Sequence, residues 1–539
     1  MHIIAVTSLE KVFLDQAPQP QAVAPEGFQN EIISWQLALL SDKPERAYIH
    51  AAVESPIAAY VRLRQVRHVP VRVPAFQNTD DNYLRKTPGL YPDLLSDIGP
   101  HSLRVYPNQW ESIWIEVDPR SELQPGTYPV TITFTDDEGE ELGSHTQKIR
   151  VLPGLLPEQT LIHTKWFYTD CLANYYHVEA FSEEHWRIIE NFMREAVRGG
   201  INMILTPVHT PPLDTRRGGE RLTTQLVDVT VENGEYRFGM DKLHRWIQLC
   251  KKVGVKHYEI AHLFTQWGAQ HAPKIMATVD GEYKRIFGWE TDAAGPEYGA
   301  FLKAYIPAIR EVLRAEGVEQ NSWWHISDEP QEAHLPFYLA AKKQVTELLK
   351  GCPIMDALSS YAFYEQGLVK HPVVASNHMA PFLENNVPDR WMYYCCGQHI
   401  GVSNLFIAMP GARNRILGLQ LFKYDIVGFL QWGFNFYNSQ YSDYPIDPYA
   451  TADVDGFAQA GDAFQVYPGP GGVPEISMRH AVTIESMQDL RAIQWLASLD
   501  AEAAQEIVKD ITLTEYPHDA KGVLALRKKV NEAICRLNA

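Results

Sequence analysis

The chain has 539 residues, of which 45% are hydrophobic and 21% are charged, as in an ordinary globular protein. Its length predicts two to four domains. The net charge is −18, because 66 acidic residues outnumber 48 basic ones. Nucleic acids and anionic membranes bind clustered Lys and Arg, so this balance argues against both as main partners.

The six cysteines form no CxxC pair, and two of them, Cys395 and Cys396, are adjacent. This spacing predicts neither a disulfide framework nor a zinc site. Residues 1–6 carry no basic stretch and begin no long apolar run. We therefore expect no signal peptide and no transmembrane span, and we expect the protein in the reducing cytoplasm.

Residues 1–155 predict an N-terminal β-sandwich. Apolar and polar residues alternate in the candidate strands 103–106, 112–117, 127–135 and 147–152. Short alternating strands separated by turn residues are typical of sandwiches. Pro153 and Pro157 then bracket a linker to the next domain.

Residues 156–455 predict a (β/α)8 barrel, because short apolar runs alternate with helical segments. The eight runs are 161–168, 201–208, 256–264, 323–327, 354–358, 373–376, 391–395 and 427–432. A 3.6-residue apolar period marks helices at 183–198, 240–252, 298–315 and 333–350. This number and size of units fit a TIM barrel. A doubly wound sheet is the alternative, but it favours a glycine-rich turn after its first strand, and residues 167–171 contain no glycine.

The last segment, residues 456–539, predicts a turn-rich loop and a helical tail packed on the barrel. Its helical patterns cover residues 478–499, 501–511 and 521–537. The predicted fold is thus a multidomain β plus α/β protein: a β-sandwich, a TIM barrel and a C-terminal helical segment.

Two adjacent carboxylates end the fourth apolar run, which reads Ser322-Trp-Trp-His-Ile-Ser-Asp328-Glu329-Pro330. In barrels the active site lies at the C-terminal ends of the strands. A desolvated Glu329 at that point would have a raised pKa, as a general acid needs near neutral pH. The structural alternative is that Asp328 only caps a helix that starts after Pro330.

Polar and aromatic residues follow the other predicted strands. Sugars need this combination, because their C–H faces stack on rings and their hydroxyls need hydrogen-bond partners. The candidate sugar-binding residues are Trp166, His209, Trp324, Tyr361, Asn377, His378, Tyr394, Gln431, Trp432 and Asn435.

The sequence contains no strong pattern of metal-binding residues. The sequence contains 20 His, and His257-Tyr-Glu259-Ile-Ala-His262 resembles a ligand set. Strand alternation would however place His262 on the opposite face from His257 and Glu259. HExxH, serine-hydrolase and phosphate-loop motifs are absent. We expect neither a metal nor a cofactor.

With the Asp328-Glu329-Pro330 motif, several downstream segments resemble glycoside hydrolase family 123 and related uncharacterised barrel domains. They are residues 391–396, 407–415, 428–432, 461–469 and 477–479. The resemblance is most specific over about residues 320–490 and agrees elsewhere in layout.

This resemblance implies a retaining exo-β-N-acetylgalactosaminidase with substrate-assisted catalysis, in which the 2-acetamido oxygen of the substrate attacks the anomeric carbon. Glu329 would be the general acid and then the base, and Asp328 would orient the acetamido group. Such enzymes need no separate protein nucleophile. Family 20 hexosaminidases share the Asp-Glu pair, so the pair indicates the mechanism better than the sugar.

Two departures from the family pattern imply a different specificity. Residues 483–489 read Thr-Ile-Glu-Ser-Met-Gln-Asp, where relatives often have Arg-Asp-Gly, and Leu419-Gln420 stands where relatives tend to have Trp.

Two other functions remain open. One is a hydrolase of a β-glycoside without an acetamido group, with Asp170 or Glu259 as nucleophile. The other is a carbohydrate-binding protein without catalysis. In each case the expected partner is a small sugar, with a homodimer possible through exposed sandwich strands.

Overall fold

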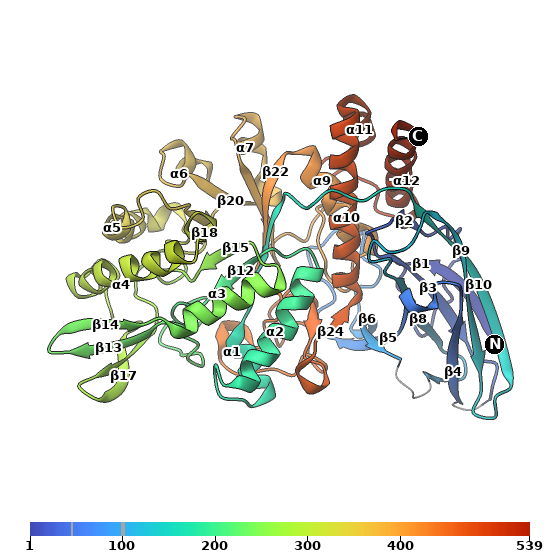
Figure 1. The fold of residues 1–539 in the computed structure, drawn as a ribbon, viewed down its shortest axis with the longest axis horizontal. Coiled ribbons are helices and arrows are strands. Elements are labelled where there is room, and N and C mark those ends of the chain that lie inside the picture. The colour runs from blue at the N-terminus through green and yellow to red at the C-terminus, as the bar shows by residue number, and fades with distance from the viewer. Residues whose placement is uncertain (45–46, 99–102, 539) are drawn as a thin grey trace.

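The computed structural model describes residues 1–44, 47–98 and 103–538. Figure 1 shows an elongated molecule with a β-rich region at the N-terminal end and an α/β barrel beside it. Helix α10 runs between the two. Within the described ranges no helix is long and apolar enough to cross a membrane.

The N-terminal region contains two sheets. The first has the order β1 (His2–Thr7), β3 (Ile33–Leu40), β8 (Trp110–Val117), β5 (Val61–Val71), β6 (Gly89–Asp97), β24 (Glu475–Ser477) and β23 (Val466–Tyr467). The second has the order β2 (Glu26–Phe28), β10 (Glu141–Leu152), β9 (Gly126–Thr135), β4 (Ala47–Glu54) and β7 (Leu103–Val105). Alternate side chains from strands of both sheets form one buried cluster that includes Trp35, Ile115 and Phe134, as in a sandwich.

Eight parallel strands form the barrel. Their order is β18 (Ser322–Trp324), β15 (His257–Ile260), β12 (Met203–Thr206), β11 (Ile162–Lys165), β22 (Ile426–Gln431), β21 (Arg390–Tyr394), β20 (His371–Ala375) and β19 (Met355–Ala357). A parallel bridge between Trp324 and Ile354 joins the two ends of this sheet. The barrel prediction is therefore confirmed, and each of the eight apolar runs overlaps one strand.

The helices follow the predicted patterns, except that the helix predicted at 333–350 spans only Leu335–Val345. The larger ones around the barrel are α2 (Glu183–Arg198), α3 (Asp241–Val253), α4 (Pro296–Ala315) and α5 (Leu335–Val345). The shorter ones are α1 (Thr169–Tyr176), α6 (Tyr361–Glu365), α7 (Ala380–Glu384), α8 (Gly411–Arg415) and α9 (Leu417–Lys423). Gly254 ends α3 with φ of +100°, a conformation that favours glycine.

The last helices are α10 (Met478–Leu499), α11 (Ala501–Val508) and α12 (Ala520–Leu537). Buried ion pairs fasten them to the N-terminal sheets: Arg479 binds Asp93 at 2.9 Å, and Arg527 binds Glu31 at 2.6 Å. Because β23 and β24 extend the first sheet, the segment after residue 455 joins the sandwich to the barrel.

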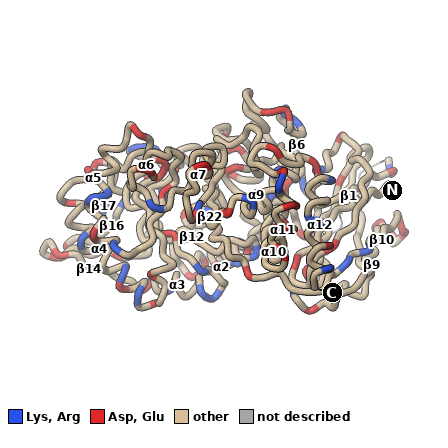
Figure 2. The backbone as a smooth tube through the Cα atoms, turned by 90° about the horizontal axis from the view of Figure 1, so that it is seen from above, with Lys and Arg blue, Asp and Glu red and all other residues tan. Residues whose placement is uncertain are grey.

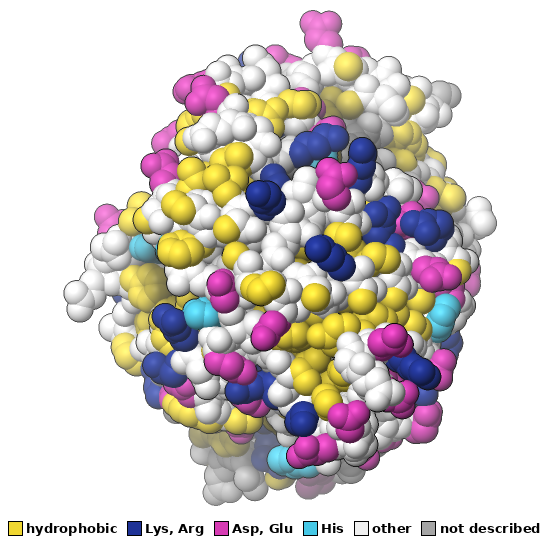
Figure 3. Space-filling model, turned by 90° about the vertical axis from the view of Figure 1, so that its left-hand side faces the viewer, with side chains coloured by type: hydrophobic (Ala, Val, Ile, Leu, Met, Phe, Trp, Pro, Cys, Tyr) yellow, Lys and Arg dark blue, Asp and Glu magenta, His cyan; other side chains and the backbone are white. Residues whose placement is uncertain are grey.

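A small four-stranded sheet was not expected from the sequence. Its order is β14 (Glu235–Gly239), β13 (Asp228–Glu232), β16 (Ile275–Val279) and β17 (Glu282–Phe287). It is built from the loops after β12 and β15 and lies at the end of the molecule far from the sandwich. Figure 3 looks onto that end and shows apolar side chains interspersed with charged ones. Figure 2 likewise shows acidic and basic residues mixed along the molecule.

Candidate active site

The mouth of the barrel is formed by the residues that directly follow its eight strands. Asp328 and Glu329 lie there, after β18, and both side chains are half-buried. Glu329 has φ of +44°, and its N–H donates to the carbonyl of Ala357 at 2.9 Å. A non-glycine residue in this conformation is strained, and such strain often marks a functional site. On a regular strand the adjacent Asp328 and Glu329 would point to opposite faces, but the turn here ends the strand, so this separation does not apply to them.

Asp328 does not cap a helix. The next helical turn, η3 (Glu332–His334), has Gln331 as its N-cap. The only structural alternative that the sequence left for Asp328 is therefore excluded.

The inward face of the barrel is identified by two tryptophans. The rings of Trp323 on β18 and Trp391 on β21 lie 5.0 Å apart, although these strands are not neighbours. Tyr393, two residues after Trp391, shares its face and reaches the mouth. The Tyr393 hydroxyl donates to Glu329 Oε1 at 2.8 Å.

Three like charges surround Asp328. Burial and the nearby carboxylates of Glu329, Asp214 and Asp356 raise the pKa of Asp328 well above its ordinary value, against the opposite effect of His325. Burial also raises the pKa of Asp214 to about 6, against the opposite effects of Arg221 and of the Tyr168 hydrogen bond. Asp214 belongs to the loop after β12 and was missed in the sequence, because no motif distinguishes it.

A fourth carboxylate lies on the segment that follows the barrel. Asp462 Oδ2 accepts a 2.8 Å hydrogen bond from Nε1 of Trp432, which is half-buried after β22. Asp462 Oδ1 is buried without a protein partner. Burial raises the pKa of this carboxyl to about 7. An unpartnered buried oxygen is costly unless water or a ligand donates to it.

Beneath the mouth, a histidine joins two acids inside the barrel. His325 donates to Glu259 Oε1 at 2.8 Å, lies 3.7 Å from Asp356 and stacks on His262 with ring centroids 4.0 Å apart. Burial lowers the pKa of His325, but its hydrogen bonds and the charges of Glu259 and Asp356 outweigh this effect and raise the pKa to about 9. His325 is therefore a buried imidazolium near neutral pH.

Both alternative nucleophiles are occupied by protein partners. Glu259 accepts hydrogen bonds from Thr164, Trp166 and His325, and its side chain is fully buried. Asp170 forms a bidentate pair with Arg221 at 2.9 and 2.6 Å, and it is also buried. Neither carboxylate is available for a substrate in this structure.

Some predicted sugar-binding residues lie at the mouth. Asn377 and His378 are exposed after β20, and Asn377 accepts a hydrogen bond from Gln398 at 3.1 Å. Trp166 lies deeper, where its ring edge meets His262. Gln431 is buried and donates to the carbonyl of Asp462 at 2.7 Å, so it supports Asp462 and not a sugar directly.

The other predicted residues make protein contacts elsewhere. Adjacent residues on a strand point to opposite faces, so Trp324 and Tyr394 point away from the barrel interior that Trp323 and Tyr393 face. Trp324 is fully buried there, and Tyr394 packs on Phe429. His209 is buried beside Tyr305 and donates to the carbonyl of His262.

Asn435 bonds the backbone of Tyr168, and Tyr361 packs on Phe382. We leave these five residues out of the proposed sugar site, because their side chains are already engaged.

The two departures from the family pattern also lie in buried protein contacts. Glu485 and Asp489 bind Arg415, each at 2.8 Å, and Asp489 also binds Arg527. Gln420 donates to the carbonyl of Thr512. These residues hold α10 in place and do not reach the mouth.

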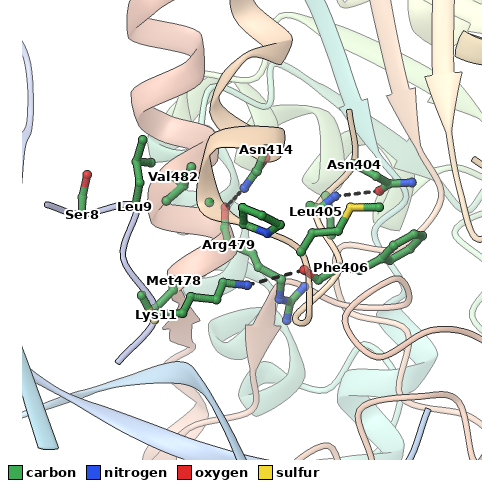
Figure 4. A pocket seen from close by; sticks show the side chains of 13 residues that line it. Ser8, Leu9, Lys11, Asn404, Leu405, Phe406, Asn414, Met478, Arg479 and Val482 are labelled. Carbon is green, nitrogen blue, oxygen red and sulfur yellow. Dashed lines mark hydrogen bonds between the residues drawn. The ribbon is translucent and has the colours of Figure 1, made fainter. Parts of the chain in front are cut away.

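A cavity between the N-terminal strand and α10 is not a second sugar site. Its free volume of about 10 Å³ suits a single water molecule. Figure 4 shows the Lys11 side chain crossing it to the carbonyl of Phe406, 3.5 Å away. Burial lowers the pKa of Lys11 to about 7. Among the described residues, no three His, Cys, Asp or Glu side chains are arranged to hold a metal.

The sequence model of the glycoside hydrolase 123 catalytic domain matches residues 166–496. The chain belongs to glycoside hydrolase family 123. Among solved structures, a family 123 glycoside hydrolase from Clostridium perfringens, studied for glycolipid glycan hydrolysis, covers 99% of this chain and 98% of its own, with a TM-score of 0.74 and 12% identity. At this identity the likeness shows the shared fold.

Two weaker structural similarities are to other glycosidases. A β-glucuronidase from Parabacteroides merdae covers 90% of this chain and 52% of its own, with a TM-score of 0.31 and 9% identity. An endo-β-1,4-mannanase from Thermotoga petrophila covers 63% of this chain and 78% of its own, with a TM-score of 0.32 and 11% identity. The comparison with curated protein sequences finds no match. As a member of family 123, the protein is a glycoside hydrolase.

Proposed function

We propose that the protein is a retaining exo-β-N-acetylgalactosaminidase that uses the substrate's own 2-acetamido group as nucleophile. The observation that carries this proposal is the adjacent pair Asp328 and Glu329 at the mouth, combined with the engagement of Asp170 and Glu259 elsewhere. An enzyme with a protein nucleophile needs a second carboxylate about 5 Å from the acid, and the two carboxylates that the sequence offered for this role, Asp170 and Glu259, are both held by protein partners.

In the proposed mechanism Glu329 protonates the leaving oxygen while the acetamido oxygen attacks the anomeric carbon. Asp328 accepts a hydrogen bond from the acetamido N–H and stabilises the positive charge of the oxazolinium intermediate. Glu329 then removes a proton from water, which opens this intermediate with retention. Tyr393 holds the Glu329 carboxylate through its 2.8 Å hydrogen bond.

The proposed sugar site also uses Trp432, Asp462, Asn377 and His378. The half-buried Trp432 ring would stack on the sugar, and Asp462 Oδ1 would accept from a sugar hydroxyl. Asn377 and His378 are exposed after β20, which is separated from β22 by β21 alone, and they would contact the substrate beside Tyr393.

The test compares nitrophenol release from β-GalNAc, β-GlcNAc and β-galactoside substrates, for wild type and Glu329→Gln. Activity on β-GalNAc that the variant loses supports the proposal. Activity on the plain galactoside would contradict it, because that sugar has no acetamido group. A purely carbohydrate-binding protein would bind these sugars in calorimetry and hydrolyse none.

A further inference from the structure

An aromatic pair, one ring exposed and the other half-buried, borders the mouth and has no part in the mechanism above. Trp267, in the loop after β15, is 41% exposed, although both of its neighbours in the chain, Gln266 and Gly268, are buried. Its ring meets that of Tyr441, in the loop after β22, with centroids 5.8 Å apart and planes at 85°. We call these two residues the Trp267–Tyr441 rim.

The rim is held in a strained and specific conformation. Trp267 and Tyr441 have φ of +57° and +59°, which non-glycine residues rarely adopt. Gly268 follows with φ of +120°, and a Cβ there would lie 2.9 Å from the His334 ring, so the turn packs closely on η3. Strain that exposes the Trp267 ring and leaves the Tyr441 ring half-buried beside it is better explained by a ligand than by core packing.

Hydrogen bonds connect the rim to the proposed catalytic residues. The Trp267 N–H donates to the carbonyl of Asp328 at 2.9 Å. Ser442, next to Tyr441, donates to the carbonyl of Asp214 at 2.7 Å. Gln266, next to Trp267, accepts from the N–H of Asp214 at 2.6 Å. The rim is thus fixed in position relative to Asp328.

The Tyr441 ring is supported from a third loop. The Arg216 N–H donates to the carbonyl of Tyr441 at 2.9 Å, and its guanidinium lies 5.1 Å from the centre of the ring. Asp443 holds the same guanidinium at 2.8 and 2.6 Å. The charge of Arg216 is therefore already paired, and what the rim offers to a ligand is two aromatic faces.

We propose that the Trp267–Tyr441 rim is the leaving-group subsite, where a hexopyranose residue beyond the cleaved bond stacks. This inference rests on the proposed function. In the proposed function the reacting sugar contacts the half-buried Glu329 and Trp432 and the buried Asp462, whereas Trp267, whose N–H bonds the Asp328 carbonyl, is exposed to solvent. Two rings at nearly a right angle present one flat face and one edge, which suit the apolar face of a pyranose.

The experiment compares a substrate with a sugar leaving group and one without. The first is β-GalNAc-(1→3)-galactose, and the second is β-GalNAc fluoride, whose leaving group is too small to touch the rim. The measured quantity is the ratio of kcat/KM for the disaccharide to kcat/KM for the fluoride. The proteins are wild type, Trp267→Ala, Trp267→Phe and Tyr441→Ala, with Tyr283→Ala as control. Tyr283 lies on β17 and is a 63% exposed aromatic residue remote from the mouth.

We expect Trp267→Ala to lower the ratio about tenfold, which corresponds to about 1.4 kcal/mol, mainly through KM. Trp267→Phe keeps a ring and should stay near wild type, Tyr441→Ala should lower the ratio, and Tyr283→Ala should not change it. An unchanged ratio in Trp267→Ala, or an equal loss on both substrates, would overturn the inference. If Trp267→Ala does not fold, the same ratio measured for Tyr441→Ala tests the inference: a lowered ratio supports it and an unchanged ratio overturns it. A wild type inactive on both substrates would instead refute the proposed function and the inference with it.

Discussion

The Tyr393 hydroxyl donates a 2.8 Å hydrogen bond to Glu329 Oε1 and so joins the fourth and seventh strands across the mouth of the barrel. This contact fixes the carboxylate that we propose as the acid and base. The neighbouring Tyr394 points outward, and its hydroxyl is buried without a partner.

Tyr393→Phe should therefore lower kcat/KM about 10- to 100-fold, since a hydrogen bond to a charged group contributes about 1.5–3 kcal/mol. Tyr394→Phe is the matched control, because it removes the same atom from the other face of the strand. We expect it to retain wild-type turnover and stability. Equal effects of the two variants in steady-state kinetics would show that the Glu329 contact has no catalytic importance.

Glu329→Gln should lower kcat/KM by about 10²–10⁴-fold on β-GalNAc glycosides, because the amide cannot transfer the proton. Asp328→Asn should impair 2-acetamido substrates most, since it no longer accepts from the acetamido N–H as an anion. Thermal unfolding should show that both variants are folded. Wild-type rates in both variants would rule out this pair as the catalytic residues.

The acid limb of the pH profile should depend on Asp214. Asp328 must be ionised to bind the acetamido N–H, and burial, Glu329 and Asp214 raise its pKa. Asp214→Asn removes one negative charge, so the pKa of Asp328 should fall and the acid limb of kcat/KM should move to lower pH. Asp425→Asn, an exposed change in the loop that precedes β22, is the control and should leave the limb in place. A limb that moves to higher pH in Asp214→Asn would contradict this electrostatic account.

His325 should stabilise the fold in a pH-dependent way. Its pKa is about 9 in the folded protein and about 6.5 when unfolded, so its contribution is fully present below about pH 6.5 and is lost as the pH rises through 9. His325→Gln should cost about 3–5 kcal/mol at pH 6, the range for breaking a buried ion pair, and less at pH 9.5. Thermal unfolding at the two pH values measures this difference. His50→Gln, which removes an exposed His–Asp pair, should show little change at either pH, and a pH-independent loss in His325→Gln would argue against the buried imidazolium.

The sequence predicted the parts of the structure that depend on local periodicity. The limits of α2 and α10 agree with the predicted 183–198 and 478–499, because an amphipathic or buried helix has a clear apolar period. Asp328 and Glu329 were placed at a strand end by the same reasoning. The sheet of β13, β14, β16 and β17 was missed, although its two hairpins turn at Asn233-Gly234 and Asp280-Gly281, dipeptides typical of tight hairpins. Only the parallel pairing of β13 with β16, which joins two separate loops, leaves no local signal.

The candidate sugar site was predicted less well, for a physical reason. A strand has two faces, and a one-residue error in phase exchanges them. We predicted Trp324 and Tyr394 as sugar-binding residues, but their neighbours Trp323 and Tyr393 face the barrel interior. Both faces of such a short strand are apolar, so the sequence does not show which residues point inward. Asp214 and Asp462 come from loops, and only tertiary structure brings them to the mouth.

The central claim is that the acetamido group of the substrate is the nucleophile, and its electron density tests this directly. The measurement is kcat/KM for β-GalNAc glycosides with mono-, di- and trifluorinated acetamido groups, all with the same leaving group. Fluorine withdraws electrons from the attacking oxygen, so kcat/KM should fall progressively with each added fluorine. A rate that is independent of fluorination, together with a covalent glycosyl–enzyme trapped on a carboxylate, would contradict the proposed mechanism.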